Sequence, residues 1–191
     1  MMKKIFFAII ALAMTLGAQA QNAEKLYDEG KALYDAKNYA EAFPKLKLAA
    51  EKGNKKAQYR LGRCYDKGNG VEENDKLAFE WYMKAAEQDH AKSQYQVGKC
   101  YKNGEGVDKD RKKAVEWFAK AARQDNADAQ YALGKSYLKG KGVAADEKKA
   151  KSLLSKAVNN PKGGDEVLAE LRKDAADGDE DAKAILKLLG K

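Results

Sequence analysis

The residues best placed for chemistry form two repeating sets, one of tyrosines and one of cations. Each cation follows a tyrosine by four positions, and residues at i and i+4 share one face of an α-helix. The eight residues are Tyr27, Lys31, Tyr59, Arg63, Tyr95, Lys99, Tyr131 and Lys135. Phenol groups beside a row of positive charges suit an extended peptide that carries carboxylates. The alternative is a solvated lysine face in which the tyrosines serve packing, because repeats that arise by duplication are not independent observations.

Residues for catalysis or metal binding are scarce. His90 is the only histidine, and asparagine fills its slot in two sister repeats, so we predict a helix cap or turn role for it. One histidine and two cysteines are too few for a zinc site, which needs three or four ligands. Ser136 and Lys139 match the S-x-x-K motif of serine β-lactamases, but S-D-N and K-T-G are absent. We therefore predict no enzyme activity, no metal and no cofactor.

The tyrosines and cations belong to a sequence repeat with a period of 36 residues. The segment from Tyr95 to Ala121 has one copy before it and one after it, each with the same glycines and alanines. A fixed period of this size indicates a repeat array, in which each unit buries its apolar face against its neighbours. Three repeats are predicted, at residues 55–90, 91–126 and 127–160.

Each repeat carries the local signals of a helix, a glycine loop and a second helix. Asparagine, aspartate and histidine precede the helices as N-caps, and glycine ends the first helix. The predicted N-caps are Asn54, Asn74, His90, Asp110, Asn126 and Asp146, and the predicted C-terminal glycines are Gly68, Gly104 and Gly140.

The two ends of the array depart from the repeat. Residues 21–54 predict a shorter helical hairpin, in which Pro44 should distort the second helix. The turn NNPKGGD ends the regular period, and two closing helices, Asp165 to Ala176 and Glu180 to Leu189, are expected beyond it. We interpret residues 161–191 as a helical cap with a polar outer face.

The motifs A-x-x-x-L-G-x-x-Y, G-x-G-V and A-x-x-W-[YF]-x-K-A-A resemble those of the Sel-one-like repeat (SLR) family, a branch of the tetratricopeptide-repeat (TPR) superfamily. The resemblance is specific over residues 55–158, and residues 21–54 resemble a TPR hairpin. It implies an all-α fold, a right-handed α-α superhelix of antiparallel helical hairpins. It also implies a protein-interaction scaffold whose first helices line a concave groove, so that both residue sets would face that groove.

From the resemblance and the residues we expect an exported adaptor that binds a partner protein or an acidic peptide. Two alternatives remain open. A cysteine-rich branch of the family, with a disulfide in each repeat, has been credited with penicillin-recognising or β-lactam-hydrolysing activity, but this chain has only two cysteines. The other alternative is a structural spacer in an envelope assembly.

The N-terminus resembles an export signal, with Lys3 and Lys4 before an apolar run and Ala18-Gln19-Ala20 at its end. The apolar run has about 12 residues, whereas a membrane-spanning helix needs about 20. Residues 1–20 are therefore predicted to be a cleaved signal peptide, which leaves a periplasmic or secreted chain with no stable membrane insertion.

The chain is basic, with a formal net charge of +8, but lysine and glutamate are interspersed along it. This mixture is typical of a solvated helical surface and not of nucleic-acid-binding arms. We expect a monomer with a protein or peptide partner and no nucleic acid.

Cys64 and Cys100 occupy one repeat slot. Equivalent helices of neighbouring repeats are expected about 9 to 10 Å apart, whereas a disulfide needs Cα atoms within about 7 Å. We predict two reduced, largely buried thiols, against the tendency of oxidising compartments to favour pairing.

Overall fold

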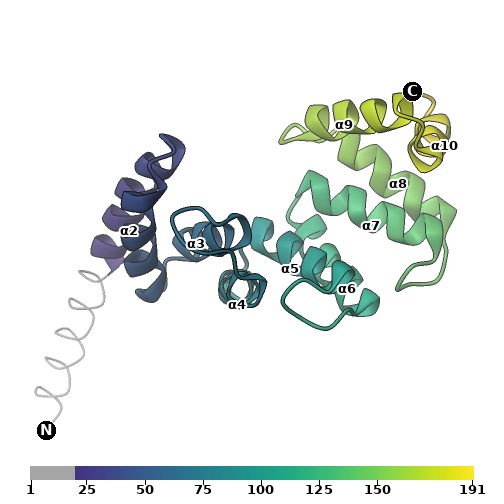
Figure 1. Cartoon of the computed structure of the whole chain (residues 1–191). Helices are drawn as coiled ribbons and strands as arrows, with labels where there is room; N and C mark the ends of the chain where they lie inside the picture. The colour runs from purple at the N-terminus through teal and green to yellow at the C-terminus, as the bar shows by residue number, and fades with distance from the viewer. Residues whose placement is uncertain (1–19) are drawn as a thin grey trace, which may run out of the picture. The chain divides into compact units, whose positions relative to one another are not determined.

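The computed structural model describes residues 20–191, and these residues form helices joined by turns, with no strand among them (Figure 1). The chain divides into two units, the first ending at Gln88 and the second spanning Asp89–Lys191. Apart from its last residue, the predicted signal peptide lies outside the described residues. No helix over residues 20–191 is both long and apolar enough to cross a membrane.

The first unit contains two helical hairpins. A helix over residues 20–35 is followed by α2 (Tyr39–Glu51), and α3 (Lys55–Lys67) is followed by α4 (Asp75–Ala86). Helix α2 runs without interruption although Pro44 lies inside it. Leu46 and Leu61 are fully buried in the core of this unit.

The second unit contains six helices that pack as consecutive neighbours (Figure 1). They are α5 (Ala91–Asn103), α6 (Arg111–Arg123), α7 (Ala127–Lys139), α8 (Glu147–Val158), α9 (Gly164–Ala176) and α10 (Glu180–Leu189). Helices α9 and α10 occupy the positions where the sequence predicts two closing helices. They pack on α8 and on each other through Leu171 and Ile185, both buried.

The predicted caps are confirmed. At each predicted asparagine or aspartate N-cap, a side-chain oxygen accepts a hydrogen bond from a backbone N–H of the following turn. For example, the amide of Ala129 donates to Asn126 at 2.8 Å. His90 takes the same position, and its Nδ1 atom lies 3.3 Å from the amide nitrogen of Ser93. Gly68, Gly104 and Gly140 end their helices in the left-handed conformation, which costs glycine little.

Each hairpin packs closely because a glycine of its first helix faces a large side chain of its second. At Gly98, an added Cβ atom would lie 2.5 Å from the ring of Phe118, and at Gly134 it would lie 2.8 Å from Cγ of Leu154. The same pairing joins Gly62 to the ring of Tyr82 at 2.6 Å. The repeated glycine therefore sets the distance between paired helices, and so fixes where the tyrosines and cations of the first helices lie.

Candidate functional site

In the first unit, the predicted tyrosine Tyr27 belongs to the core. Its side chain is buried, and the Nζ atom of Lys56 lies 5.5 Å from the centre of its ring. Tyr59 is half-buried, and its ring centre lies 6.0 Å from that of Tyr82. These two rings therefore contribute packing as well as surface.

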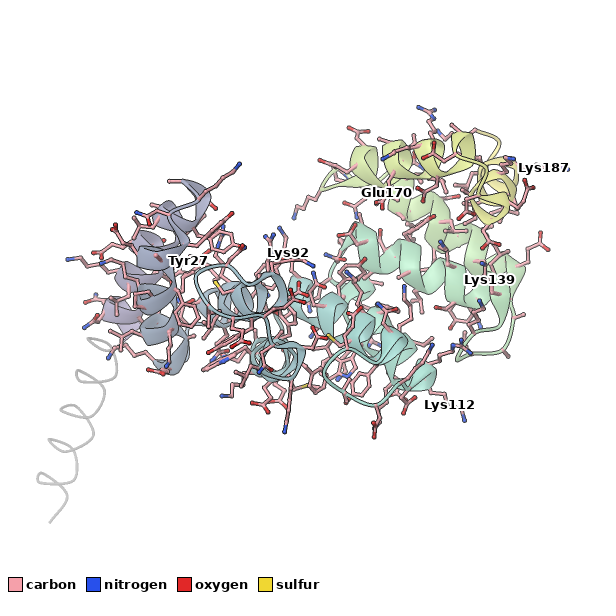
Figure 2. The ribbon with its side chains drawn as sticks, in the orientation of Figure 1. Tyr27, Lys92, Lys112, Lys139, Glu170 and Lys187 are labelled. Carbon is pink, nitrogen blue, oxygen red and sulfur yellow. The ribbon has the colours of Figure 1, made fainter. Side chains whose placement is uncertain are left out.

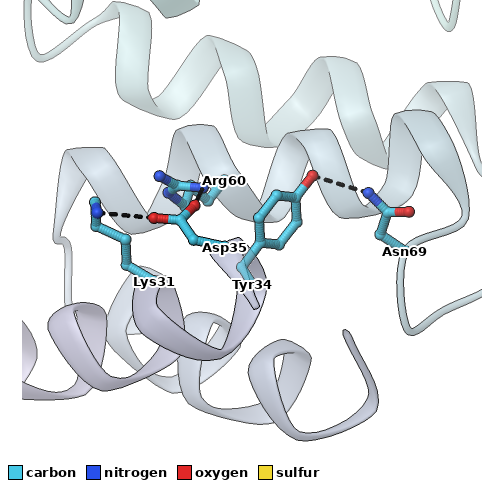
Figure 3. Close-up of polar contacts among 5 residues, drawn as sticks. All are labelled: Lys31, Tyr34, Asp35, Arg60 and Asn69. Carbon is cyan, nitrogen blue, oxygen red and sulfur yellow. Dashed lines mark hydrogen bonds and ion pairs between the residues drawn. The ribbon is translucent and has the colours of Figure 1, made fainter. Parts of the chain in front are cut away.

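The predicted cations of the first unit are engaged within it. Lys31 forms an ion pair with Asp35 at 2.8 Å, and the same carboxylate accepts Nη1 of Arg60 at 3.0 Å (Figure 3). The hydrogen bond from Lys31 and the charge of Arg60 hold the pKa of Asp35 below its usual value, although burial opposes the shift. Lys31 thus shares one carboxylate of its own helix with Arg60.

Arg63 lies against an aromatic ring. Its guanidinium carbon is 5.7 Å from the ring centre of Tyr34, and that of Arg60 is 5.1 Å from the same ring. Tyr34 is buried, and its hydroxyl accepts a hydrogen bond from the side chain of Asn69 at 2.8 Å (Figure 3). A cation in such a contact is attracted by the face of the ring. The repeated cations of this unit therefore already contact other residues of the same unit: Lys31 contacts Asp35, and Arg63 contacts Tyr34.

In the second unit, three of the predicted residues come together. Tyr95 from α5 and Tyr131 and Lys135 from α7 line one cavity of about 370 Å³, which also contacts α6. Nζ of Lys135 lies 5.2 Å from the ring centre of Tyr131. Lys99, the fourth predicted residue, does not line this cavity, but its charge acts on the neighbouring Lys102.

The cavity carries a concentration of positive charge that the repeat pattern does not predict. Besides Lys135, its basic lining residues are Lys102, Lys109, Arg111, Lys139 and Lys141. Burial and the charges of Lys135 and Lys99 lower the pKa of Lys102. Burial and the nearby Lys141 and Lys135 lower that of Lys139, although Lys139 also pairs with Asp181. Burial is the larger cause of both shifts, and repulsion between the neighbouring cations adds to it.

The two tyrosines at this cavity remain hydrogen-bond donors over the whole physiological range. Burial, assisted by the carboxylates of Asp128 and Glu170, raises the pKa of Tyr95 well above its usual value. Burial and the carboxylates of α9 and Asp179 raise the pKa of Tyr131 to about 12. Protonated phenols and crowded ammonium groups are both donors for an anion.

The repeated glutamines of the first helices do not contribute to the candidate site. Gln58, Gln94 and Gln130 are buried. Each accepts a hydrogen bond from an amide 30 positions later: from Gln88 at 2.7 Å, from Gln124 at 2.8 Å and from Asn160 at 3.1 Å. Buried polar groups need such partners, so this repeated slot is structural.

The residues weighed for catalysis have structural contacts. Ser136 lines the cavity, but its hydroxyl donates to the carbonyl oxygen of Ala132 at 2.9 Å. Lys139, the lysine of the S-x-x-K match, is paired with Asp181. In the part of the chain that the structure describes, no three histidine, cysteine or acidic side chains cluster as metal ligands.

Both cysteines are buried thiols, as predicted. Burial raises the pKa of Cys64 to about 11, because its effect is larger than the opposite effect of the positive charges of Arg60 and Arg63. Because the thiolate is the nucleophile, about one Cys64 side chain in a thousand would be reactive at pH 8.

We expect Cys64 in the folded chain to react with iodoacetamide at pH 8 far more slowly than in guanidinium, where its pKa returns to about 8.5. Mass spectrometry of the peptide that contains Cys64, sampled over time, measures both rates. Equal rates in the two conditions would show that the thiol is accessible in the native chain.

Comparison with known proteins places this geometry in a family. The Sel1 repeat family matches residues 55–90, 91–126 and 127–161, which together exceed half of the chain. No curated protein sequence matches the chain.

Two solved structures are similar over most of the chain. A Sel1 repeat protein from Oxalobacter formigenes is 32% identical, with a TM-score of 0.69, over 84% of this chain and 74% of that one. A protective antigen of uropathogenic Escherichia coli strains, which displays an SLR fold, is 27% identical with a TM-score of 0.68. That match covers 87% of this chain but only 41% of the antigen. The predicted all-α helical-repeat fold is thus confirmed, and the chain belongs to the Sel1 repeat family.

Proposed function

We propose that this chain is an exported protein-interaction module that binds a partner through the tyrosines and cations of its first helices. Sel1 repeat proteins generally mediate protein–protein interactions and are typically not catalytic. The observation that carries the proposal is the cavity in the second unit, where Tyr95, Tyr131 and Lys135 lie together. Export rests on the signal-like residues 1–20.

The two units contribute unequally to the proposed binding. The charges of Lys31 and Arg63 are engaged with Asp35 and Tyr34, so a ligand would have to compete with these contacts. We assign Tyr27, Lys31, Tyr59 and Arg63 a supporting role in partner contact. The dominant role falls to Tyr95, Lys99, Tyr131 and Lys135, because Lys99 and Lys135 add to the repulsion among neighbouring cations, which an anion would relieve.

The charge distribution of the second unit favours a protein over a nucleic acid as partner. Glu170 extends from α9 on the side that faces α7 (Figure 2), and its charge reaches both Tyr95 and Tyr131. Glu166 and Asp174 lie four residues before and four residues after Glu170, on the same face of α9, and they act on Asp128 and Tyr131. A phosphate backbone extended along this face would meet these carboxylates.

A pull-down with residues 21–191 tests the proposal. We expect Lys99→Glu/Lys135→Glu to lose a partner that the unchanged chain captures from the envelope or secreted fraction, because two attractive charges become repulsive. Lys112→Glu/Lys148→Glu is the matched control, with the same change in net charge on exposed lysines. Lys112 points away from the unit (Figure 2). Circular dichroism checks that all three proteins are equally helical.

The possible results separate the remaining functions. Equal capture by the unchanged chain and both variants would overturn binding through these cations. No specific partner for any of them would favour a structural spacer in an envelope assembly. A labelled β-lactam that attaches covalently to Ser136 would instead support a penicillin-recognising hydrolase.

A further inference from the structure

The cavity between α5, α6 and α7 has the composition of an anion site. Six of its lining side chains are basic, and none is aspartate or glutamate. Its floor is apolar, since Phe118 and Ala114 are buried and Ala132 is half-buried. Positive charges next to low-dielectric apolar walls strengthen the attraction for a negatively charged group.

The size of the cavity limits what can occupy it. A volume of about 370 Å³ lies near the lower end of the range for small-ligand pockets, about 300 to 1,000 Å³. It therefore accommodates a few side chains of a peptide but not a folded surface. The phenols of Tyr95 and Tyr131 add two hydrogen-bond donors to the lining.

We propose that this cavity binds an acidic segment of a protein partner, with at least two neighbouring aspartate or glutamate side chains seated among Lys102, Lys109, Arg111, Lys135 and Lys141. The inference rests on the proposed function and names the part of the partner that is recognised. Two close carboxylates match several cations better than one does. Lys139 contributes less, because Asp181 already pairs with it.

The acidic face of α9 explains why the segment should be short. Glu166, Glu170 and Asp174 act on Asp128, Tyr95 and Tyr131, so negative charge lies near both tyrosines. A compact group of carboxylates stays within the cavity, whereas a long polyanion would extend over the α9 carboxylates. We therefore expect an acidic peptide to bind more tightly than an oligonucleotide of equal charge.

Fluorescence anisotropy with a synthetic peptide tests this inference. The probe is a labelled Asp-Glu-Asp-Glu-Asp-Glu peptide with both ends blocked, and Asn-Gln-Asn-Gln-Asn-Gln serves as its uncharged counterpart. Residues 21–191 are compared with Lys109→Gln/Lys141→Gln at the cavity and with Lys112→Gln/Lys148→Gln away from it. All four lysines are exposed, so neither variant should impair folding.

We expect the cavity variant to weaken binding of the acidic peptide by about tenfold or more and the control variant by less than about twofold. Binding should also weaken as salt rises, because the contacts are electrostatic. No binding of the acidic peptide, equal binding of the uncharged peptide, equal losses in the two variants, or tighter binding of a single-stranded oligonucleotide of the same charge would each overturn the inference.

The peptide-binding experiment and the pull-down can contradict their two proposals independently. If a partner is captured through Lys99 and Lys135 but the acidic peptide does not bind, the inference about the cavity is wrong and the proposed function stands. If the acidic peptide binds at the cavity but no partner is captured, the cavity is supported and the proposed function is wrong.

Discussion

Replacing Gly142 by alanine is expected to destabilise the second unit by about 2 to 5 kcal/mol. Gly142 has φ of +80°, and an added Cβ atom would lie 2.2 Å from the carbonyl oxygen of Arg111 and 2.6 Å from its carbonyl carbon. Because these are backbone atoms at the start of α6, they cannot rotate away as a side chain would. The loop after α7 must therefore move off α6, or the chain must accept a strained left-handed alanine.

Gly140→Ala is the matched control for this prediction. Gly140 has a similar φ of +62°, but its added Cβ atom would meet Ala145 at an ordinary 3.4 Å. Only the left-handed strain applies there, at a cost of about 1 kcal/mol. Urea unfolding followed by circular dichroism measures both variants. Equal losses would show that close approach to Arg111 adds nothing to the conformational requirement.

Gly68 and Gly70 form the equivalent pair in the first unit, so the same comparison of alanine variants can be made there. Gly70 has φ of +76°, and its added Cβ atom would lie 2.3 Å from the carbonyl oxygen of Tyr39, the first residue of α2. Gly68 has φ of +64° and no contact closer than 3.6 Å. In both loops the second glycine is therefore the one that lies against backbone. The physical reason is that this loop lies on the first turn of the preceding hairpin's second helix.

Features that repeat could be predicted from the sequence, because three copies of one pattern confirm one another. The caps are the best case: asparagine, histidine and asparagine in one slot predicted a helix start, and His90 accepts the same kind of amide contact as Asn54 and Asn126. The glycines that end the first helices, Gly68, Gly104 and Gly140, were predicted in the same way. These signals are local, so they do not depend on the neighbouring units.

Repetition alone does not show whether a polar slot is exposed or buried. The buried glutamine slot repeats together with a second slot that supplies its amide partner. The pairs, each 36 residues after the last, are Gln58 with Gln88, Gln94 with Gln124, and Gln130 with Asn160. A repeated polar residue on a first helix therefore looks the same in sequence whether it lines a groove or satisfies a buried hydrogen bond. The second repeated amide slot, 30 residues after each glutamine, is the sequence signal that indicates a buried hydrogen bond.

Most of the cationic cavity could not be found by comparing repeats, because its basic residues do not repeat. One period later, Leu138 stands in the slot of Lys102, Ala145 in that of Lys109 and Glu147 in that of Arg111. Lys135 belongs to the repeated cations, whereas Lys102, Lys109 and Arg111 do not. In a repeat protein the scaffold lies in the shared residues, whereas a site specific to one hairpin lies in the departures from them.

Truncating Phe118 to alanine is expected to cost about 3 to 5 kcal/mol, which is usual for a fully buried phenylalanine. Only 1% of this side chain is exposed, and its ring packs on Gly98 and lies 5.8 Å from the ring of Tyr95. Removing the ring leaves a cavity between α5 and α6 that the backbone of Gly98 cannot fill. Urea unfolding measures the loss, and Leu48→Ala, at a side chain that is 44% exposed, is the surface control.

Phe118→Leu separates loss of volume from loss of the aromatic ring. The equivalent side chain of the next hairpin is Leu154, which is fully buried against Gly134, so leucine is compatible with this slot. We expect Phe118→Leu to cost about 1 to 2 kcal/mol, clearly less than the alanine variant. If both variants cost the same, the slot would depend on the ring and its contact with Tyr95. In that case, the side chain opposite the repeated glycine would matter for its aromatic contact and not for the volume that it fills.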